Sequence, residues 1–236
     1  MSVATTTSSR PATARRTTIG LKILMAGTGL VFVGYLLLHM FGNLKALAGE
    51  EAFNDYAENL RTVGEPFLPY AGLLWIVRVV LLLSLVGHAY AAYSLWARAG
   101  SARRTKYAAV KTAARTAWMR WGGTFLLLFV VWHLLQFTIV KFSVNADKQG
   151  PDVQQNPYEL VVASFQVPWN TLIYVLAMVA LAFHLSHGVF SASQTLGLTG
   201  SAQAYRRAKL LGHAVAVVIV GGFLVPPFAI LFGLIK

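Results

Sequence analysis

The chain has 236 residues, of which 56% are hydrophobic and 12% charged, and its mean hydropathy is +0.59. These proportions exclude a soluble globular domain and indicate an integral membrane protein. The lack of cysteine excludes disulfides, thiolate metal sites and cysteine-ligated iron–sulfur clusters, so any metal must be bound through nitrogen or oxygen.

The N-terminal segment 1–18 is rich in Ser, Thr, Ala and Arg and has too little apolar surface to fold alone. We predict a disordered cytoplasmic tail there, followed by one five-helix transmembrane domain over residues 19–236. The apolar run at 23–41 is longer than the usual hydrophobic region of a signal peptide, which has about 7 to 15 residues. It is therefore predicted to stay as the first helix.

Five apolar stretches are long enough to span a hydrocarbon core, which needs about 20 residues per helix. They cover residues 21–41, 70–96, 121–140, 169–190 and 211–235. Strands of a membrane barrel need only about 9 to 11 residues of alternating character, so this length favours helices. The predicted fold class is an all-α membrane protein with five transmembrane helices in one bundle. The long connections near 43–68 and 142–167 are expected to fold over the bundle mouth, with a short surface helix at 51–60.

Charges are sharply partitioned among the connections. Basic residues concentrate before the first helix, between the second and third, and between the fourth and fifth, whereas all eight acidic residues lie in the other two connections. The positive-inside rule therefore predicts a cytoplasmic N-terminus and a C-terminus outside. Topology accounts for the net charge of +12, and no nucleic-acid partner is predicted.

One histidine falls at its own depth in each of the first four apolar stretches: His39, His88, His133 and His184. A polar imidazole in a bilayer is costly and needs a reason, such as a bound metal, a proton path or a hydrogen bond. With the predicted topology, His39 and His133 lie about 25 and 18 Å from the cytoplasmic ends of their helices. His88 and His184 lie about 27 and 22 Å below the outer ends of theirs. The first two therefore share an outer level, and the last two share an inner level.

Two imidazoles from different helices can bind one iron from opposite faces of a flat macrocycle. The two levels therefore predict two haems, whose saturated irons would carry electrons and bind neither oxygen nor substrate. A lone intramembrane histidine is more often a packing residue, but depth-matched pairs favour ligands. Glycines near these histidines could let a ring approach the backbone, yet they equally serve helix packing. They are Gly34, Gly42, Gly87 and Gly188.

Three further polar residues lie in or near the predicted spans. His187 follows His184 by three residues on the same side of the helix, so spacing alone does not choose between them as ligand. His213, beside basic residues at the start of the fifth span, is predicted to be interfacial. Arg78 is the only Arg or Lys well inside an apolar stretch. Its predicted partner is either a propionate of the outer haem or, by snorkelling, the outer interface.

Short motifs around the histidines carry a family resemblance. They are Leu38-His39-Met40 followed by Gly49-Glu50-Glu51-Ala52-Phe53-Asn54, then His88-Ala89-Tyr90, Trp132-His133 and Phe183-His184-Leu185-Ser186-His187-Gly188. In the order and spacing of these motifs, the chain resembles the cytochrome b membrane anchor of succinate dehydrogenase and fumarate reductase, in its single-subunit, five-helix, two-haem form. The resemblance covers essentially the whole chain after the tail.

The resemblance implies one ligand from each of the first four helices, paired first with third and second with fourth, and it assigns the fourth ligand to His184 and not to His187. It further implies two haem b groups, with menaquinone as electron acceptor or donor. A flavoprotein subunit with covalent FAD and an iron–sulfur subunit are implied on the cytoplasmic face of a prokaryotic inner membrane. The chain would then carry electrons between the iron–sulfur subunit and the quinone without binding succinate.

The residues leave other classes open. The histidines and Arg78 could form a proton or substrate path in a transporter, although no inverted repeat or Pro/Gly-broken helix pair at the midplane supports this. The chain could also be a haem-free anchor that only holds a partner at the membrane. A cytochrome b serving a hydrogenase or formate dehydrogenase would have a different ligand distribution.

Overall fold

A computed structural model describes residues 17–101 and 112–236. Within these ranges the chain is helical and contains no strand, and five of the helices are long and apolar enough to cross a membrane. The predicted class, an all-α membrane protein with five spanning helices, is therefore confirmed. Nearly all of the predicted tail at 1–18, and much of the basic connection after the second span, lie outside the described residues.

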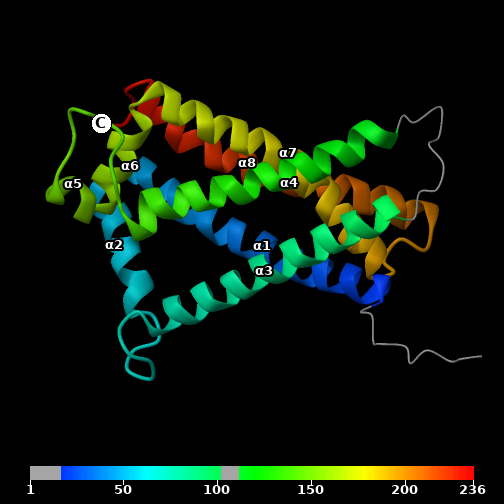
Figure 1. Ribbon diagram of the computed structural model, residues 1–236. Coiled ribbons are helices and arrows are strands. Elements are labelled where there is room, and N and C mark those ends of the chain that lie inside the picture. The colour runs from blue at the N-terminus through cyan, green and yellow to red at the C-terminus, as the bar shows by residue number, and fades with distance from the viewer. Residues whose placement is uncertain (1–16, 102–111) are drawn as a thin grey trace, which may run out of the picture.

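The spanning helices run in alternating directions through one bundle (Figure 1). They are α1 (Thr18–Leu44), α3 (Gly72–Ser101), α4 (Thr112–Leu134), α7 (Pro168–Thr195) and α8 (Ala202–Leu231). A 3₁₀ turn, η1 (Lys45–Ala48), continues α1, and a π-helical turn, η2 (Leu135–Ile139), continues α4. Because the number of spans is odd, α1 begins at one end of the bundle and the chain finishes at the other.

The two ends of the bundle differ in charge. The basic end is the one where α1, α4 and α8 begin; its described basic residues are Lys22, Arg98, Arg120, Arg206, Arg207 and Lys209. The acidic end is the opposite one, formed by the segments 45–71 and 140–167, and it carries all eight carboxylates. At the basic end, the Arg98 guanidinium donates to the Thr18 hydroxyl at 3.3 Å and ties the end of α3 to the start of α1. Which side of the membrane each end faces stays a prediction.

Large apolar side chains cover the outside of the bundle. Leu38 on α1, Leu83 on α3 and Val217 on α8 are 69%, 66% and 72% exposed. Apolar surface on this scale is unfavourable in water but is the ordinary lipid-facing surface of a membrane helix. The exposure pattern and the lengths of the helices therefore both indicate helices that span a membrane.

The fifth span begins at Ala202, earlier than the predicted residue 211. The Ser201 hydroxyl accepts a hydrogen bond from the Ala204 backbone at 3.1 Å, and this N-cap lets the helix start among polar residues. The basic residues at 206, 207 and 209 consequently lie in the first turns of α8 and not in a loop. The helix also continues through the buried Pro226-Pro227 pair.

The core of the bundle lies between α7 and α8, which pack along most of their length. Ala177 and Leu181 of α7 meet Ala216 and Ile219 of α8 there, with apolar side chains of α1 and α4 against them. Helix α1 packs on α3, α7 and α8, whereas α4 packs mainly on α7. Helix α3 is thus attached to the bundle chiefly through α1.

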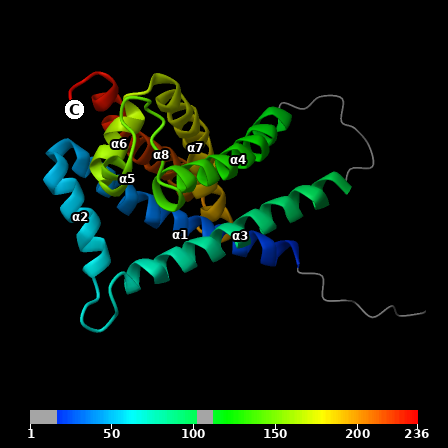
Figure 2. The ribbon, with the colours of Figure 1, turned by 60° about the vertical axis from the view of Figure 1, so that its left-hand side comes forward.

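Three short helices cover the acidic end. Helix α2 (Glu50–Thr62) lies across the ends of the spanning helices, as Figure 2 shows, and confirms the predicted surface helix. Helices α5 (Pro151–Gln155) and α6 (Pro157–Phe165) come from the second long connection. The Asn54 side-chain amide donates to Asn156 Oδ1 at 3.0 Å, and Asn156 also caps α6. The two long connections are therefore joined to each other over the bundle.

The closest backbone approach in the core is at Gly212, where a Cβ would collide with the Ser186 carbonyl oxygen of α7. We predict that Gly212→Ala destabilises the protein by about 1 to 3 kcal/mol, because a backbone neighbour has no rotamer with which to move away. The measurement is the thermal unfolding midpoint in detergent. The matched control is Gly221→Ala on the same helix, which has no atom within 4 Å of its Cβ position and is expected to leave the midpoint unchanged or higher. An equal midpoint for both variants would contradict the prediction.

Candidate functional site

The structure brings the four intramembrane histidines together in two pairs. The rings of His39 on α1 and His133 on α4 have centroids 5.7 Å apart at an interplanar angle of 78°. The rings of His88 on α3 and His184 on α7 have centroids 6.1 Å apart at 57°. We call the first the acidic-end pair and the second the basic-end pair, after the end of the bundle that each is nearer. The same residues are paired by the depth argument, and their role as ligands stays a prediction.

The helices that carry each pair are not the ones that pack extensively. In the described ranges, extensive backbone contacts join α1 to α3, α7 and α8, and α4 to α7, but no such extensive contact joins α1 to α4 or α3 to α7. The histidine side chains therefore bring together helices whose backbones are not extensively packed on each other.

The ring separations fit a shared metal ion. A metal to imidazole nitrogen distance of about 2 Å places two opposed nitrogens about 4 Å apart, and the ring centroids then lie about 6 Å apart. The observed 5.7 and 6.1 Å are close to this value. No cluster of three or more His, Cys, Asp or Glu occurs in the described parts of the chain. Each pair thus offers two imidazoles, a donor set that would suit a haem because the macrocycle supplies the other four nitrogens.

Glycines on neighbouring helices flank the basic-end pair. A Cβ at Gly29 of α1 would lie 3.4 Å from His88 Cε1, and one at Gly123 of α4 would lie 3.4 Å from His184 Cε1. The sequence did not point to these two glycines, because they are close to the histidines in space and not along the chain. Gly87, which the sequence did point to, serves close packing of α3 against Thr28 of α1.

One ring in each pair has a hydrogen bond at Nδ1. His88 Nδ1 lies 3.1 Å from the Thr28 hydroxyl, which itself donates to the Leu24 carbonyl at 2.7 Å. His133 Nδ1 lies 3.4 Å from the Tyr174 hydroxyl. Because each hydroxyl donates elsewhere, each accepts from the histidine, which places the ring proton on Nδ1 and leaves Nε2 unprotonated. Hydrogen bonding of this kind fixes the tautomer and orientation of a metal-binding histidine.

A buried polar cluster extends from the acidic-end pair toward α6. It consists of Tyr174, Gln136, Ser164 and Asn170, of which the last three are fully buried. None of these residues belongs to a motif recognised from the sequence. Gln136 and Asn170 are polar residues in or at the edge of apolar stretches, and that signal could have identified them.

Arg78 lies on the acidic-end half of α3. Its guanidinium stands 4.9 Å from the centroid of the Trp75 ring on the same helix. It is also within electrostatic range of Tyr35, whose ring stacks on His39 at 5.3 Å. Among the residues that the structure describes, no carboxylate pairs with Arg78. The arginine therefore lies on the same side as the acidic-end pair without an anionic protein partner.

The two remaining histidines lie outside both pairs. His213 Nδ1 is 2.7 Å from the Ser186 hydroxyl and joins α8 to α7. His187 lies on α7 within electrostatic range of His184. The ring of His184 lies against that of His88, with centroids 6.1 Å apart, and this geometry supports His184 as the partner in the basic-end pair.

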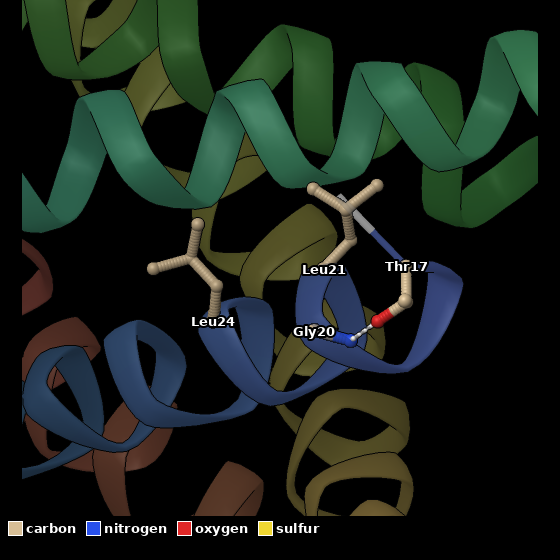
Figure 3. A pocket seen from close by; sticks show the side chains of 4 residues that line it. All are labelled: Thr17, Gly20, Leu21 and Leu24. Carbon is tan, nitrogen blue, oxygen red and sulfur yellow. Dashed lines mark hydrogen bonds between the residues drawn. The ribbon is translucent and has the colours of Figure 1, made fainter. Parts of the chain in front are cut away.

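Two surface hollows complete the candidate sites. The first, of about 460 Å³, is lined by Thr17, Gly20, Leu21 and Leu24 at the basic end. Figure 3 shows both leucines pointing from α1 toward α3, so this hollow is an apolar surface between two helices. The second, of about 760 Å³, lies at the acidic end between α2 and the α5–α6 segment, and polar and charged side chains line it. Neither hollow includes one of the paired histidines.

Comparison with known proteins places the chain in a family. It is 26% identical over 183 residues to the succinate dehydrogenase cytochrome b558 subunit of Bacillus subtilis (strain 168), a match that covers 75% of this chain and 80% of that protein. No solved structure matches the chain. The family of succinate dehydrogenase/fumarate reductase transmembrane subunits matches residues 95–225, which include His133 and His184. With more than half of its length matched, the chain belongs to the succinate dehydrogenase/fumarate reductase transmembrane subunit family.

Proposed function

We propose that the chain is a two-haem cytochrome b that anchors a succinate:quinone oxidoreductase in the membrane and carries electrons between its iron–sulfur subunit and menaquinone. The observation that carries this proposal is the presence of two facing imidazole pairs at two depths in the bundle. The name of the Bacillus subtilis relative, a succinate dehydrogenase cytochrome b558 subunit, supports both the complex and the cofactor type.

Each haem b is held by one histidine pair in this proposal. His39 and His133 hold the outer haem, and His88 and His184 hold the inner haem. A haem bound by two imidazoles supplies a one-electron carrier with no open iron position. The chain itself binds each haem from two helices, orients one ring of each pair through a hydrogen bond and keeps water out with apolar side chains.

The basic end faces the cytoplasm in this proposal. The positive-inside rule supports this orientation, because the described basic residues gather at that end and all carboxylates at the other. A flavoprotein subunit with FAD and an iron–sulfur subunit would dock on the basic end of the bundle. The protein would then be a multi-pass subunit of a prokaryotic inner membrane, with residues 1–18 as a cytoplasmic tail.

Arg78 is proposed to contact a propionate of the outer haem. An arginine in the hydrocarbon region is costly without an anion, and the described residues offer no carboxylate there. The electrostatic proximity of Arg78 to Tyr35, which stacks on His39, supports a position beside the outer haem.

The haem assignment is tested by counting haems per chain in the purified complex from reduced-minus-oxidised spectra. We expect two low-spin b haems in the wild type. His39→Leu or His133→Leu is expected to leave only the inner haem, because the one remaining imidazole of the acidic-end pair does not hold the outer haem by itself. His88→Leu or His184→Leu is expected to leave the outer haem.

The matched control is His213→Gln, which removes a histidine that is bonded to Ser186 and lies outside both pairs. It is expected to keep two haems with wild-type spectra. A wild type without haem would instead support a haem-free anchor or a transporter. Loss of the same haem in His39→Leu and His88→Leu would contradict the pairing.

A second test concerns Arg78. We expect Arg78→Gln to lower the midpoint potential of the outer haem, because removal of a nearby positive charge favours the oxidised, more positive state. The free energy of reduction of the outer haem is expected to change by about 1 kcal/mol, for a unit charge acting through an effective dielectric constant of roughly 20. Potentiometric titration of both haems measures it. Arg61→Gln, at the surface beside Glu58, is the control. An outer haem with unchanged spectrum and potential in Arg78→Gln would refute the contact.

A further inference from the structure

We propose that Tyr174, held in place by Gln136, is a positioning residue that fixes His133 and lowers the midpoint potential of the outer haem. The inference rests on the proposed function, since it presupposes that His133 is a haem ligand. It assigns a role to two residues that are not ligands themselves.

The direction of the hydrogen bonds follows from the chemistry of the groups. The Tyr174 hydroxyl donates to Gln136 Oε1 at 2.8 Å, and an amide oxygen can only accept. Since its one proton is used there, the Tyr174 oxygen accepts from His133 Nδ1, which lies 3.4 Å away. His133 is therefore protonated at Nδ1, and its Nε2 is the nitrogen available to a metal.

The orientation of the Gln136 amide is itself fixed. Its Nε2 donates to the Ser164 hydroxyl at 3.2 Å and points toward Asn170 Oδ1 at 3.5 Å. Asn170 in turn donates to the Ser164 carbonyl at 3.0 Å. The amide nitrogen thus faces two acceptors, so the amide oxygen must face Tyr174. The chain of bonds has only one consistent direction from His133 to α6.

Burial makes these bonds hard to replace. Gln136 is 0% exposed and Tyr174 is 7% exposed, so water does not substitute for a lost partner. A buried polar group without a partner costs about 1 to 3 kcal/mol. The Tyr174 ring is also held edge-on by Phe129 and Phe165, each with a centroid 4.9 Å away. The hydroxyl is therefore presented to His133 by a rigid side chain.

The backbone contributes through the π-helical turn η2. The amides of Val140 and Lys141 both donate to the Leu135 carbonyl at 3.1 Å, so the turn is wider than an α-helical one. Such turns occur frequently at functional sites, where they redirect a side chain. Here the turn contains Gln136, which is fully buried, and begins two residues after His133.

The expected consequence is electronic. A histidine that donates from Nδ1 to an acceptor is a more basic metal ligand, and a more basic ligand favours the oxidised state of the metal. Loss of the acceptor is therefore expected to raise the midpoint potential of the outer haem. The proposed inner ligands, His88 and His184, take no part in the hydrogen bonds of this cluster, so the inner haem is expected to keep its potential.

The test is Tyr174→Phe in the purified complex, which removes the hydroxyl and keeps the ring. We expect two haems per chain and an unchanged midpoint potential of the inner haem. The midpoint potential of the outer haem is expected to rise enough to shift its one-electron redox equilibrium a few-fold toward the reduced form, where a tenfold shift corresponds to about 59 mV. The low-temperature EPR signal of the outer haem is expected to shift as well. The signal that is absent in His39→Leu identifies the outer haem.

Two further variants keep the test decisive. Gln136→Met removes the acceptor of the Tyr174 proton at similar volume and is expected to raise the outer potential by a smaller factor; it replaces Tyr174→Phe if that variant loses haem. Tyr158→Phe is the matched control, because Tyr158 is a buried tyrosine of the same end whose hydroxyl bonds to the Lys236 carbonyl at 3.5 Å. It is expected to leave both potentials unchanged.

An outer potential that is unmoved or lowered in Tyr174→Phe, with two haems present, would overturn this inference alone. A shift of both haems together, or an equal shift in Tyr158→Phe, would also overturn it, because a general loosening of the bundle would then account for the effect. A wild type that contains no haem would overturn the proposed function and this inference together.

Discussion

The organisation of this bundle follows from the need to satisfy four imidazoles in an apolar interior. A neutral imidazole has one donor and one acceptor nitrogen, and in hydrocarbon neither can be left to water. For His88 and His133 the donor side is satisfied within the chain, by Thr28 and by Tyr174. The other ring nitrogen has only a second histidine ring nearby, and that ring offers no compatible bond when its own nitrogen is also unprotonated. A metal shared between the rings satisfies both nitrogens at once, and this is the physical reason that paired histidines point to haem.

The helix packing reflects the same requirement. Close packing is concentrated between α7 and α8, where Gly212 brings the two backbones together, and this contact gives the bundle a rigid side. The helices that share a histidine pair are instead not among the extensively packed ones, and α3 is attached mainly through α1. A bundle in which all helices packed closely would leave no room for a flat macrocycle between them. Under the proposed function, the uneven packing would be part of the haem sites, and Gly29 and Gly123 would leave room beside the rings of His88 and His184.

The sequence predicted the class, the five spans, the helix across the acidic end and the two histidine levels, because each depends on length, composition or the helical rise. It could not predict lateral contacts, since depth along a helix carries no information about which faces of different helices meet. For this reason Gly29 and Tyr174, which lie beside histidines of other helices, were missed. The early start of α8 was missed for a different reason: the apolar signal begins only after the polar turns that Ser201 caps. The sidedness of the membrane rests on the charge pattern alone.

The two histidine pairs differ in their surroundings, although each consists of two histidines. Under the proposed function, axial ligands of one type cannot by themselves separate the potentials of two haems, so the difference must come from neighbouring charge, polarity and hydrogen bonding. At the basic end, His88 bonds to a threonine hydroxyl, with the Met25 carbonyl also near the ring. At the acidic end, His133 bonds to a tyrosine in a buried cluster, and Arg78 adds a positive charge on the same side. These two influences act in opposite directions on the midpoint potential of the outer haem.

An electron that moves between the levels also crosses part of the membrane potential, at about 2.3 kcal/mol per 100 mV for the full span. Under the proposed function, Tyr174 and Arg78 at the acidic end would therefore set the midpoint potential of the outer haem against this electrical work without a change of axial ligand.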